Sequence, residues 1–178
     1  MEYSIKHFGR LNETDLDLIQ ITNDDVTVSF TNLGARINQW KIGSDNIILG
    51  FDNPEQAAIG KGYYYGASIG RIAGRITGGK FSINETTYQL PLNEGTNHLH
   101  GGPNGFDLKR WDYDIQQTED AIQISFSLLV KDGENHFPGN LDVQVIHSYS
   151  VNNGWSVTFK AKSDKDTLFN PTNHVYFN

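Results

Sequence analysis

The dominant pattern along the chain is a strict alternation of apolar and polar residues. It is clearest in four segments, which cover residues 26–31, 122–128, 143–151 and 155–161. β-Branched and aromatic residues supply most of the apolar positions, as is typical of pleated, half-buried surfaces. A period of two places one set of side chains on a core face and the other set on the opposite face. The pattern therefore predicts many antiparallel strands arranged in a sandwich or barrel.

Turn signals separate the predicted strands. Asn152-Asn153-Gly154 joins the last two alternating segments and predicts a hairpin. Gly78-Gly79 precedes one shorter predicted strand, and Asn84-Glu85 leads from it into the next. No segment carries an apolar stripe at i, i+3, i+4 and i+7 with capping residues, so no helix is expected. The chain, residues 1–178, is therefore predicted to be a single all-β domain without repeats or linkers.

Composition narrows the possible partners. The net charge is −7, and the 14 basic residues are scattered, which argues against nucleic acid and anionic membrane surfaces as partners. No apolar run is long enough to cross a bilayer, and residues 1–4 do not begin a signal peptide. Cysteine is absent, which fits a reducing compartment. These features predict a cytoplasmic protein; they leave its oligomeric state open.

Residues 66–76 form a glycine-rich, apolar segment that contains Arg71 and Arg75. A phosphate-binding loop requires a strand, a glycine turn and a following helix, and here the glycine spacing is wrong and a β-rich segment follows. Glycines in a strand permit close backbone packing. Two arginines in such an apolar stretch suggest one buried residue and one that points into a polar cleft.

Residues 93–107 contain His98 and His100 within a His-x-His-Gly-Gly sequence. Histidines at i and i+2 lie on one face of a strand and are a possible metal pair, although no carboxylate completes the set. Alternatively, the glycines form a turn that brings the imidazole of His100 to the rim of a cleft. A structural or merely exposed histidine is the third interpretation.

The C-terminal segment, residues 170–178, places His174 among small polar residues followed by aromatics. It resembles a loop entering a new apolar strand. An unperturbed histidine has a pKa of about 6.5 and donates a proton near neutrality. Aromatic rings beside polar groups suit a sugar, whose C–H faces stack while its hydroxyls need directed partners. A satisfied core histidine is the competing interpretation.

Together these segments resemble the aldose 1-epimerase (galactose mutarotase) family. The family motif Gly-Arg-x-Ala-Asn-Arg-Ile is matched by residues 70–76, and Asn-x-Leu-His-Gly-Gly-x-x-Gly-Phe-Asp by residues 97–107. Asp-Gly-Glu-Glu-Gly-Phe-Pro-Gly-Asn-Leu is similar to residues 132–141, and Asn-Leu-Thr-Asn-His-x-Tyr-Phe-Asn to residues 170–178. Four motifs in the family's order make the resemblance specific.

The resemblance implies an antiparallel β-supersandwich that interconverts the α and β anomers of a free aldohexose, galactose or glucose, without metal or cofactor. It places the general acid at His174. It assigns His100 a catalytic and substrate-binding position, and it places Arg75 against the sugar. Tyr176 is implied to line the same cleft. For Arg71, which also matches the motif, a structural role is favoured.

Family members are much longer than this chain, which resembles their N-terminal half. The resemblance assigns the catalytic base to a Glu, and a sugar contact to an Asp, both farther toward the C-terminus than residue 178. Glu94 and Glu134 are the nearest carboxylates in the matched motifs, and neither is assigned the role. The chain alone is therefore expected to be truncated and to have little or no mutarotase activity.

Three departures from the motifs bear on sugar preference: Gly74 replaces Asn, Pro171 replaces Leu, and His136 replaces Gly. The main alternative function is a non-catalytic sugar-binding module on the same fold. A hexose-6-phosphate epimerase would need a basic cluster for the phosphate, which the sequence lacks. A purely structural β domain would leave Arg75, His100 and His174 without a common purpose.

Overall fold

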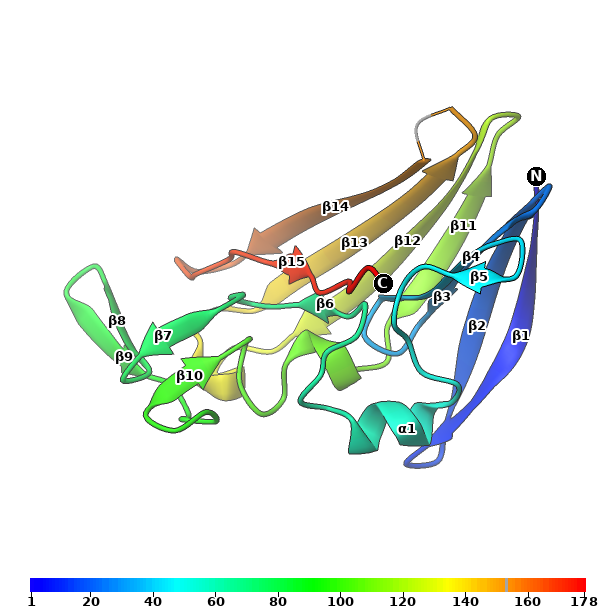
Figure 1. The fold of residues 1–178 in the computed structure, drawn as a ribbon. Coiled ribbons are helices and arrows are strands. Elements are labelled where there is room, and N and C mark those ends of the chain that lie inside the picture. Colours follow the sequence, from blue (N-terminus) through cyan, green and yellow to red (C-terminus); the bar gives the residue numbers. More distant parts are fainter. Residues whose placement is uncertain (153) are drawn as a thin grey trace.

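A computed structural model describes residues 1–152 and 154–178, and it consists mainly of antiparallel strands (Figure 1). The first large sheet is a meander in the order β1-β2-β3-β4-β5. Its strands are β1 (Glu2–Leu11), β2 (Thr14–Asn23), β3 (Val26–Thr31), β4 (Arg36–Ile42) and β5 (Asp45–Asn46). The strands follow one another in space as in sequence, as short hairpin connections require.

The second large sheet is also a meander, in the order β11-β12-β13-β14. Its strands are β11 (Asp112–Gln117), β12 (Ala121–Val130), β13 (Leu141–Ser150) and β14 (Gly154–Ser163). The predicted hairpin is confirmed by the register, which pairs Ser150 with Gly154. Asn153, at the centre of the predicted turn, lies outside the described residues.

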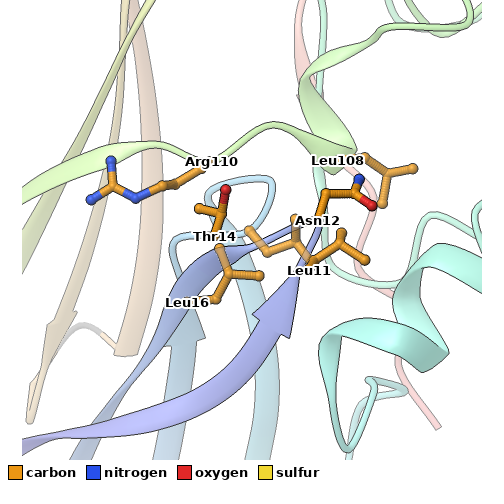
Figure 2. Close-up of a pocket in the computed structure, with 7 residues that line it drawn as sticks. Leu11, Asn12, Thr14, Leu16, Leu108 and Arg110 are labelled. Atoms are coloured by element: carbon orange, nitrogen blue, oxygen red, sulfur yellow. The ribbon is translucent and has the colours of Figure 1, made fainter.

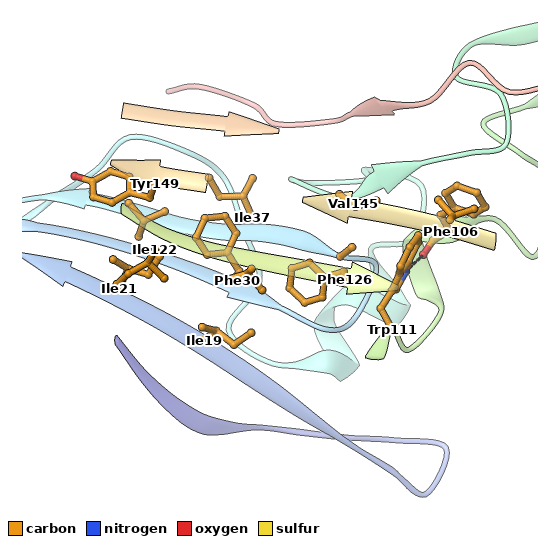
Figure 3. Close-up of a cluster of buried hydrophobic side chains, with 14 of the residues drawn as sticks. Ile19, Ile21, Phe30, Ile37, Phe106, Trp111, Ile122, Phe126, Val145 and Tyr149 are labelled. Atoms are coloured by element: carbon orange, nitrogen blue, oxygen red, sulfur yellow. Dashed lines mark hydrogen bonds between the residues drawn. The ribbon is translucent and has the colours of Figure 1, made fainter. Parts of the chain in front are cut away.

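The core lies between the two large sheets (Figure 3). β2, β3 and β4 contribute Ile19, Ile21, Val28, Phe30 and Ile37, and the facing sheet contributes Ile122, Ile124, Phe126, Val143, Val145 and Tyr149. Along the first half of β12 buried apolar positions alternate with half-buried ones, which is the alternation that the sequence predicted. The all-β fold is thus confirmed.

Two details of the sequence-based prediction are wrong. Val151 is predicted to lie in an alternating strand, but it follows the end of β13 and is exposed. The prediction of no helix misses α1 (Pro54–Ile59). Asn53 caps α1 by accepting a hydrogen bond from the backbone N–H of Gln56, and Pro54 occupies the first turn. At six residues the helix is too short to show an amphipathic period. No helix of the described residues is long and apolar enough to span a membrane.

Short strands beside the large sheets carry the matched motifs. β6 (Ser68–Ile69) pairs with β15 (Thr172–Asn173), and β7 (Arg75–Thr77) pairs with β10 (Asn97–Leu99). β8 (Lys80–Ile83) and β9 (Thr86–Gln89) form the predicted outer hairpin. Figure 1 shows these elements as an irregular layer along one side of the two sheets. The new strand expected in residues 170–178 is reduced to β15 and two isolated bridges, which pair Asn170 with Ile72 and Phe177 with Ile48.

Candidate functional site

Backbone hydrogen bonds hold His174 against the glycine-rich segment. The N–H of His174 donates to the carbonyl of Ala67 at 2.8 Å, and its carbonyl accepts from Gly66 at 2.9 Å. Gly66 has φ +64°, and a Cβ there would lie 1.8 Å from the carbonyl oxygen of Ile37. Only glycine permits this close approach. The backbone of His174 is consequently fixed beside Gly66 and Ala67, and its side chain remains half-buried.

His100 begins a turn of three consecutive residues with positive φ: His100 at +52°, Gly101 at +84° and Gly102 at +92°. This geometry confirms the turn interpretation of the His-Gly-Gly sequence. The backbone N–H of His100 donates to the carbonyl of Gly74, and the N–H of Gly74 donates to Nδ1 of His100, both at 3.0 Å. Because Nδ1 is the acceptor, the proton of the neutral imidazole is on Nε2. The ring therefore presents an N–H donor at Nε2.

The rings of His100 and His174 lie at 88° to one another with centroids 5.1 Å apart. The ring of Tyr64 contacts both, with its centroid 4.9 Å from that of His100 and 5.6 Å from that of His174. The ring centroid of Tyr176 lies 5.0 Å from that of His174. The segments that the sequence singled out separately therefore meet, and two aromatic rings border the histidines.

The surroundings of His100 decide the protonation state of its imidazole. Burial, reinforced by the charges of His174 and Arg75, lowers the pKa of His100 to about 4. His100 is consequently neutral at pH 7.

Arg75 lies at the start of β7, where it is paired in register with Leu99, the residue before His100. Its guanidinium makes a bidentate ion pair with Glu94, with Nε–Oε2 at 3.1 Å and Nη2–Oε1 at 2.8 Å. These hydrogen bonds raise the pKa of Arg75 and lower that of Glu94. The Arg75 side chain is 57% exposed, so its charge faces solvent at the edge of the site. The sequence did not reveal Glu94 as the partner of Arg75.

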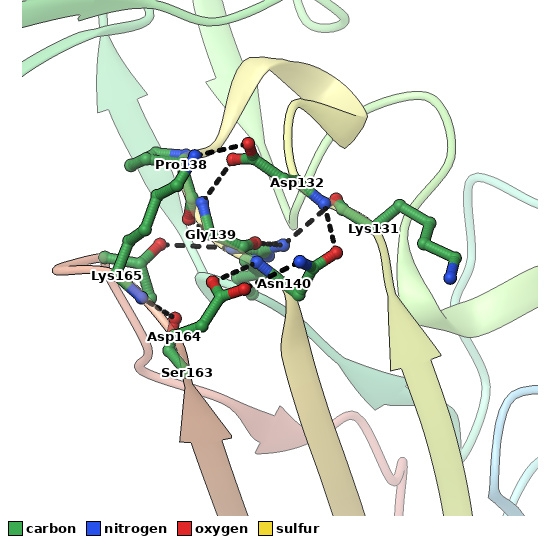
Figure 4. A network of polar contacts seen from close by, with 10 residues as sticks. Lys131, Asp132, Pro138, Gly139, Asn140, Ser163, Asp164 and Lys165 are labelled. Carbon is green, nitrogen blue, oxygen red and sulfur yellow. Dashed lines mark hydrogen bonds and ion pairs between the residues drawn. The ribbon is translucent and has the colours of Figure 1, made fainter.

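Arg71 has the structural position that the sequence favoured for it. It is buried, and its guanidinium donates to the carbonyls of Pro138 and Gly139 at 2.8 and 2.7 Å. Figure 4 shows the loop that these carbonyls belong to, where Asp132 accepts from the N–H of Gly139 and pairs with Lys165. Arg71 thus anchors the 132–139 loop rather than facing the histidines.

His98 does not act with His100 as a metal pair. Its ring is buried, lies edge-on against Phe137 at 5.4 Å, and its Nδ1 contacts the carbonyl of Pro91 at 2.8 Å. The ring of His100 instead contacts Gly74, Tyr64 and His174. The two side chains are thus committed to different surroundings.

Two of the motif departures lie in left-handed backbone. Gly74 has φ +84°, a Cβ at this position would meet no atom within 4 Å, and His136 has φ +63°. Asn and Gly are the residues best suited to such a conformation, which explains why the family motif has Asn at the first position and Gly at the second. His136 offsets its strain with a contact of 2.8 Å between Nδ1 and the carbonyl of Gln89.

A pocket of about 240 Å³ lies beside Tyr64, and its lining includes neither His100 nor His174. Tyr64 is shared between this pocket and the ring cluster, and Asp107 and Lys61 contribute opposite charges to its lining. A separate pocket of about 110 Å³ lies at the β1–β2 turn, lined by Leu11, Asn12, Thr14, Leu16, Leu33, Leu108 and Arg110 (Figure 2). Arg75, His100, His174 and Tyr176 are absent from the lining of both pockets. Tyr64, which the sequence analysis did not select, is thus the residue that joins the first pocket to the histidines.

Known proteins resemble this chain along its whole length. The sequence model of the family described as Aldose 1-epimerase matches residues 17–178. A maltose epimerase from Levilactobacillus brevis is 34% identical over 100% of this chain and 54% of its own length. A galactose mutarotase from Bos taurus is 33% identical over 92% of this chain and 47% of its own length.

Solved structures also resemble this chain. A galactose 1-epimerase from Lactobacillus acidophilus superposes with a TM-score of 0.91 at 34% identity, covering 99% of this chain and 53% of that protein. An aldose epimerase homologue from C. elegans gives a TM-score of 0.80 at 26% identity, covering 90% of this chain and 50% of that protein. The chain therefore spans about half the length of the relatives that it matches.

Proposed function

This chain belongs to the aldose 1-epimerase family, and we propose that it carries the sugar-protonating half of an aldose 1-epimerase site. It would thus be the N-terminal portion of a mutarotase-like sandwich. The single observation that supports this most strongly is the perpendicular pair formed by His100 and His174, whose ring centroids are 5.1 Å apart and whose rings both contact Tyr64. The substrate that we propose is a free aldohexose, galactose or glucose.

In the proposed reaction, a base removes the proton of the C1 hydroxyl while His174 protonates the ring oxygen. The bond between C1 and the ring oxygen breaks, C1 becomes an aldehyde, and rotation about C1–C2 followed by ring closure gives the other anomer. As the ring closes, the hydroxyl that becomes the ring oxygen returns its proton to His174, and the base returns the other proton to the oxygen on C1, so the step is balanced without a redox cofactor. A positioned acid or base typically contributes about a hundredfold to ten-thousandfold to the rate.

His100 has a different role in this proposal. Its low pKa keeps it neutral, and its Nε2–H can donate to a sugar oxygen while Nδ1 is held by Gly74. Arg75 supplies positive charge near the developing alkoxide, and its bidentate bond to Glu94 fixes the guanidinium plane. Tyr176 offers a ring face beside His174.

The base is the part of the reaction for which neither motif glutamate is suited. Glu94 is paired with Arg75, which lowers the pKa of Glu94 and weakens it as a base. Glu134 is paired with Lys109 at 2.6 Å. We therefore propose that the base is a residue that is not among residues 1–178, as the family resemblance implies.

The pairing of both motif glutamates also favours a second candidate, a sugar-binding module without catalysis. Such a module needs His100, Arg75 and the aromatic rings but no base. The two functions differ in a direct measurement, because only catalysis changes the anomeric equilibration rate of the bound sugar.

Sugar binding is tested by NMR titration of the ¹⁵N-labelled chain with galactose and glucose. We expect the imidazole signals of His100 and His174 to move in a saturable way while those of the buried His147 do not. Sorbitol, which has no pyranose ring, serves as the ligand control. Uniform, non-saturable shifts, or equal shifts with sorbitol, would refute the proposed site.

A further inference from the structure

We infer that Asn135 is a positioning residue that holds the His100 turn in its working geometry. The amide Nδ2 of Asn135 donates to the carbonyl of Gly101 at 2.8 Å. Gly101 directly follows His100 and shares its left-handed backbone. A residue 34 positions away in sequence therefore holds the peptide that aims the imidazole.

The turn needs such a restraint because its conformation is intrinsically unfavourable. His100 is a non-glycine residue with φ +52°, a left-handed conformation that an L-residue keeps only where its surroundings enforce it. Gly74 restrains the turn from one side through the backbone and Nδ1 of His100. Asn135 restrains it from the other side, and its Cγ would lie 3.0 Å from a Cβ placed on Gly102.

Asn135 is itself held firmly. It belongs to the short 3-10 turn Glu134–His136, and its neighbour Glu134 makes an ion pair with Lys109, at the far end of the same loop that His100 begins. Both partners of that ion pair are only 25% exposed. The 132–139 loop that contains Asn135 is anchored through Arg71 and Asp132 (Figure 4). Asn135 therefore contacts Gly101 from a loop that is itself anchored to the rest of the protein.

The hydrogen bond from Asn135 to Gly101 depends on the residue type that this chain has at position 135. The family motif that residues 132–141 resemble has Glu at the position of Asn135. A carboxylate has no N–H to donate to the Gly101 carbonyl, whereas the amide of Asn135 has two. The departure therefore adds a contact to the His100 turn.

The test measures the pKa and tautomer of His100 by ¹H–¹⁵N NMR in the 178-residue chain. Asn135→Ala removes the donor, and we expect the pKa of His100 to rise by about 0.5 or more, because a looser turn admits water and frees Nδ1 from Gly74. The matched control is Asn84→Ala. Asn84 and Asn135 both have left-handed backbones, with φ +47° and +49°, and Asn84 donates one side-chain hydrogen bond, to Asp166 at 2.6 Å, in the β8–β9 turn.

A His100 pKa and Nδ1 shift that are the same in Asn135→Ala as in Asn84→Ala and the wild type would overturn the inference, even if the melting temperature falls. If Asn135→Ala does not fold, Asn135→Ser replaces it, since serine is compatible with turns but is too short to reach Gly101. The inference rests on the proposed function only in assuming that His100 binds the sugar. The measurement needs no sugar, so its failure is distinct from a failure of sugar binding.

Discussion

The indole N–H of Trp155 donates to Nδ1 of His147 at 3.1 Å, and the two rings are stacked at 13°. Nε2 of the same imidazole donates to the carbonyl of Ala35 at 3.0 Å. Both ring nitrogens are thus used by a neutral, buried histidine on β13 that joins the two large sheets. Protonation at Nδ1 would break the bond to Trp155.

This arrangement predicts that stability falls in mild acid. Burial lowers the pKa of His147 to about 4, so between that value and the ordinary 6.5 the unfolded chain binds more protons than the folded one. The contribution of His147 to the free energy of unfolding is complete above pH 6.5 and is lost as the pH falls toward 4. Its limit is about 3 kcal/mol, from about 1.36 kcal/mol per pKa unit.

Urea unfolding monitored by tryptophan fluorescence between about pH 4 and pH 7.5, the window of this linkage, measures the dependence. His98 and His100, whose pKa values are also lowered, contribute in the same direction. The relevant quantity is therefore the difference in pH dependence between the wild type and His147→Leu. Identical slopes for the two proteins would contradict the role assigned to His147.

Two glycines with the same φ predict very different costs on substitution. Gly74 and Gly101 both have φ +84°, but a Cβ on Gly74 meets nothing within 4 Å, whereas one on Gly101 would lie 1.7 Å from the carbonyl oxygen of Gly70. Gly74→Ala should cost only the left-handed strain, about 1–2 kcal/mol. Gly101→Ala must also displace backbone and should cost several kcal/mol more, in the range of severe mutations.

Chemical denaturation of the two variants measures both costs. Gly74→Asn provides a further comparison, because Asn tolerates left-handed backbone and restores the residue of the family motif. We expect it to be less destabilising than Gly74→Ala and to alter sugar affinity. Equal losses of stability for Gly74→Ala and Gly101→Ala would show that the space around Gly101 is not as described.

Tyr64 is predicted to support the histidine pair through its ring rather than its hydroxyl. It contacts both imidazoles and has φ +57°, a strained conformation for a non-glycine residue. Tyr64→Phe should leave the pKa of His100 almost unchanged. Tyr64→Leu removes the flat ring, admits water, and should raise that pKa toward its ordinary value. NMR titration of both variants measures the effect, and a larger change in Tyr64→Phe would assign the role to the hydroxyl instead.

Catalysis by the chain alone is predicted to be weak or absent. Polarimetry with α-glucose or α-galactose should show mutarotation close to the buffer rate, because Glu94 and Glu134 are both held in ion pairs. Near-normal turnover would overturn the proposed absence of the base. If residues 1–178 are combined with a polypeptide that supplies the base, His174→Gln should reduce kcat by orders of magnitude. An unchanged kcat would remove His174 from the acid role.

The local sequence pattern was sufficient to predict the long strands, but it did not predict α1 or every residue of the candidate site. The alternation in residues 122–128 and 143–149 corresponds to β12 and β13, because a period of two directly encodes a half-buried strand. The helix α1 had a readable start at Asn53-Pro54 but was too short to show a period. Tyr64 and Asn135 carry no local sequence signal, since each matters only through residues that are distant along the chain.

The fold class, the absence of thiol chemistry and the candidates His100, Arg75 and His174 were all readable in the order of the amino acids. Strand periodicity and motif order are properties of neighbouring residues, which an unfolded chain already displays. Folding was needed to lower the pKa of His100, to join Glu94 to Arg75, and to bring Asn135 onto the turn. Burial and hydrogen bonding between distant segments set these properties, and both come into being only in the folded chain.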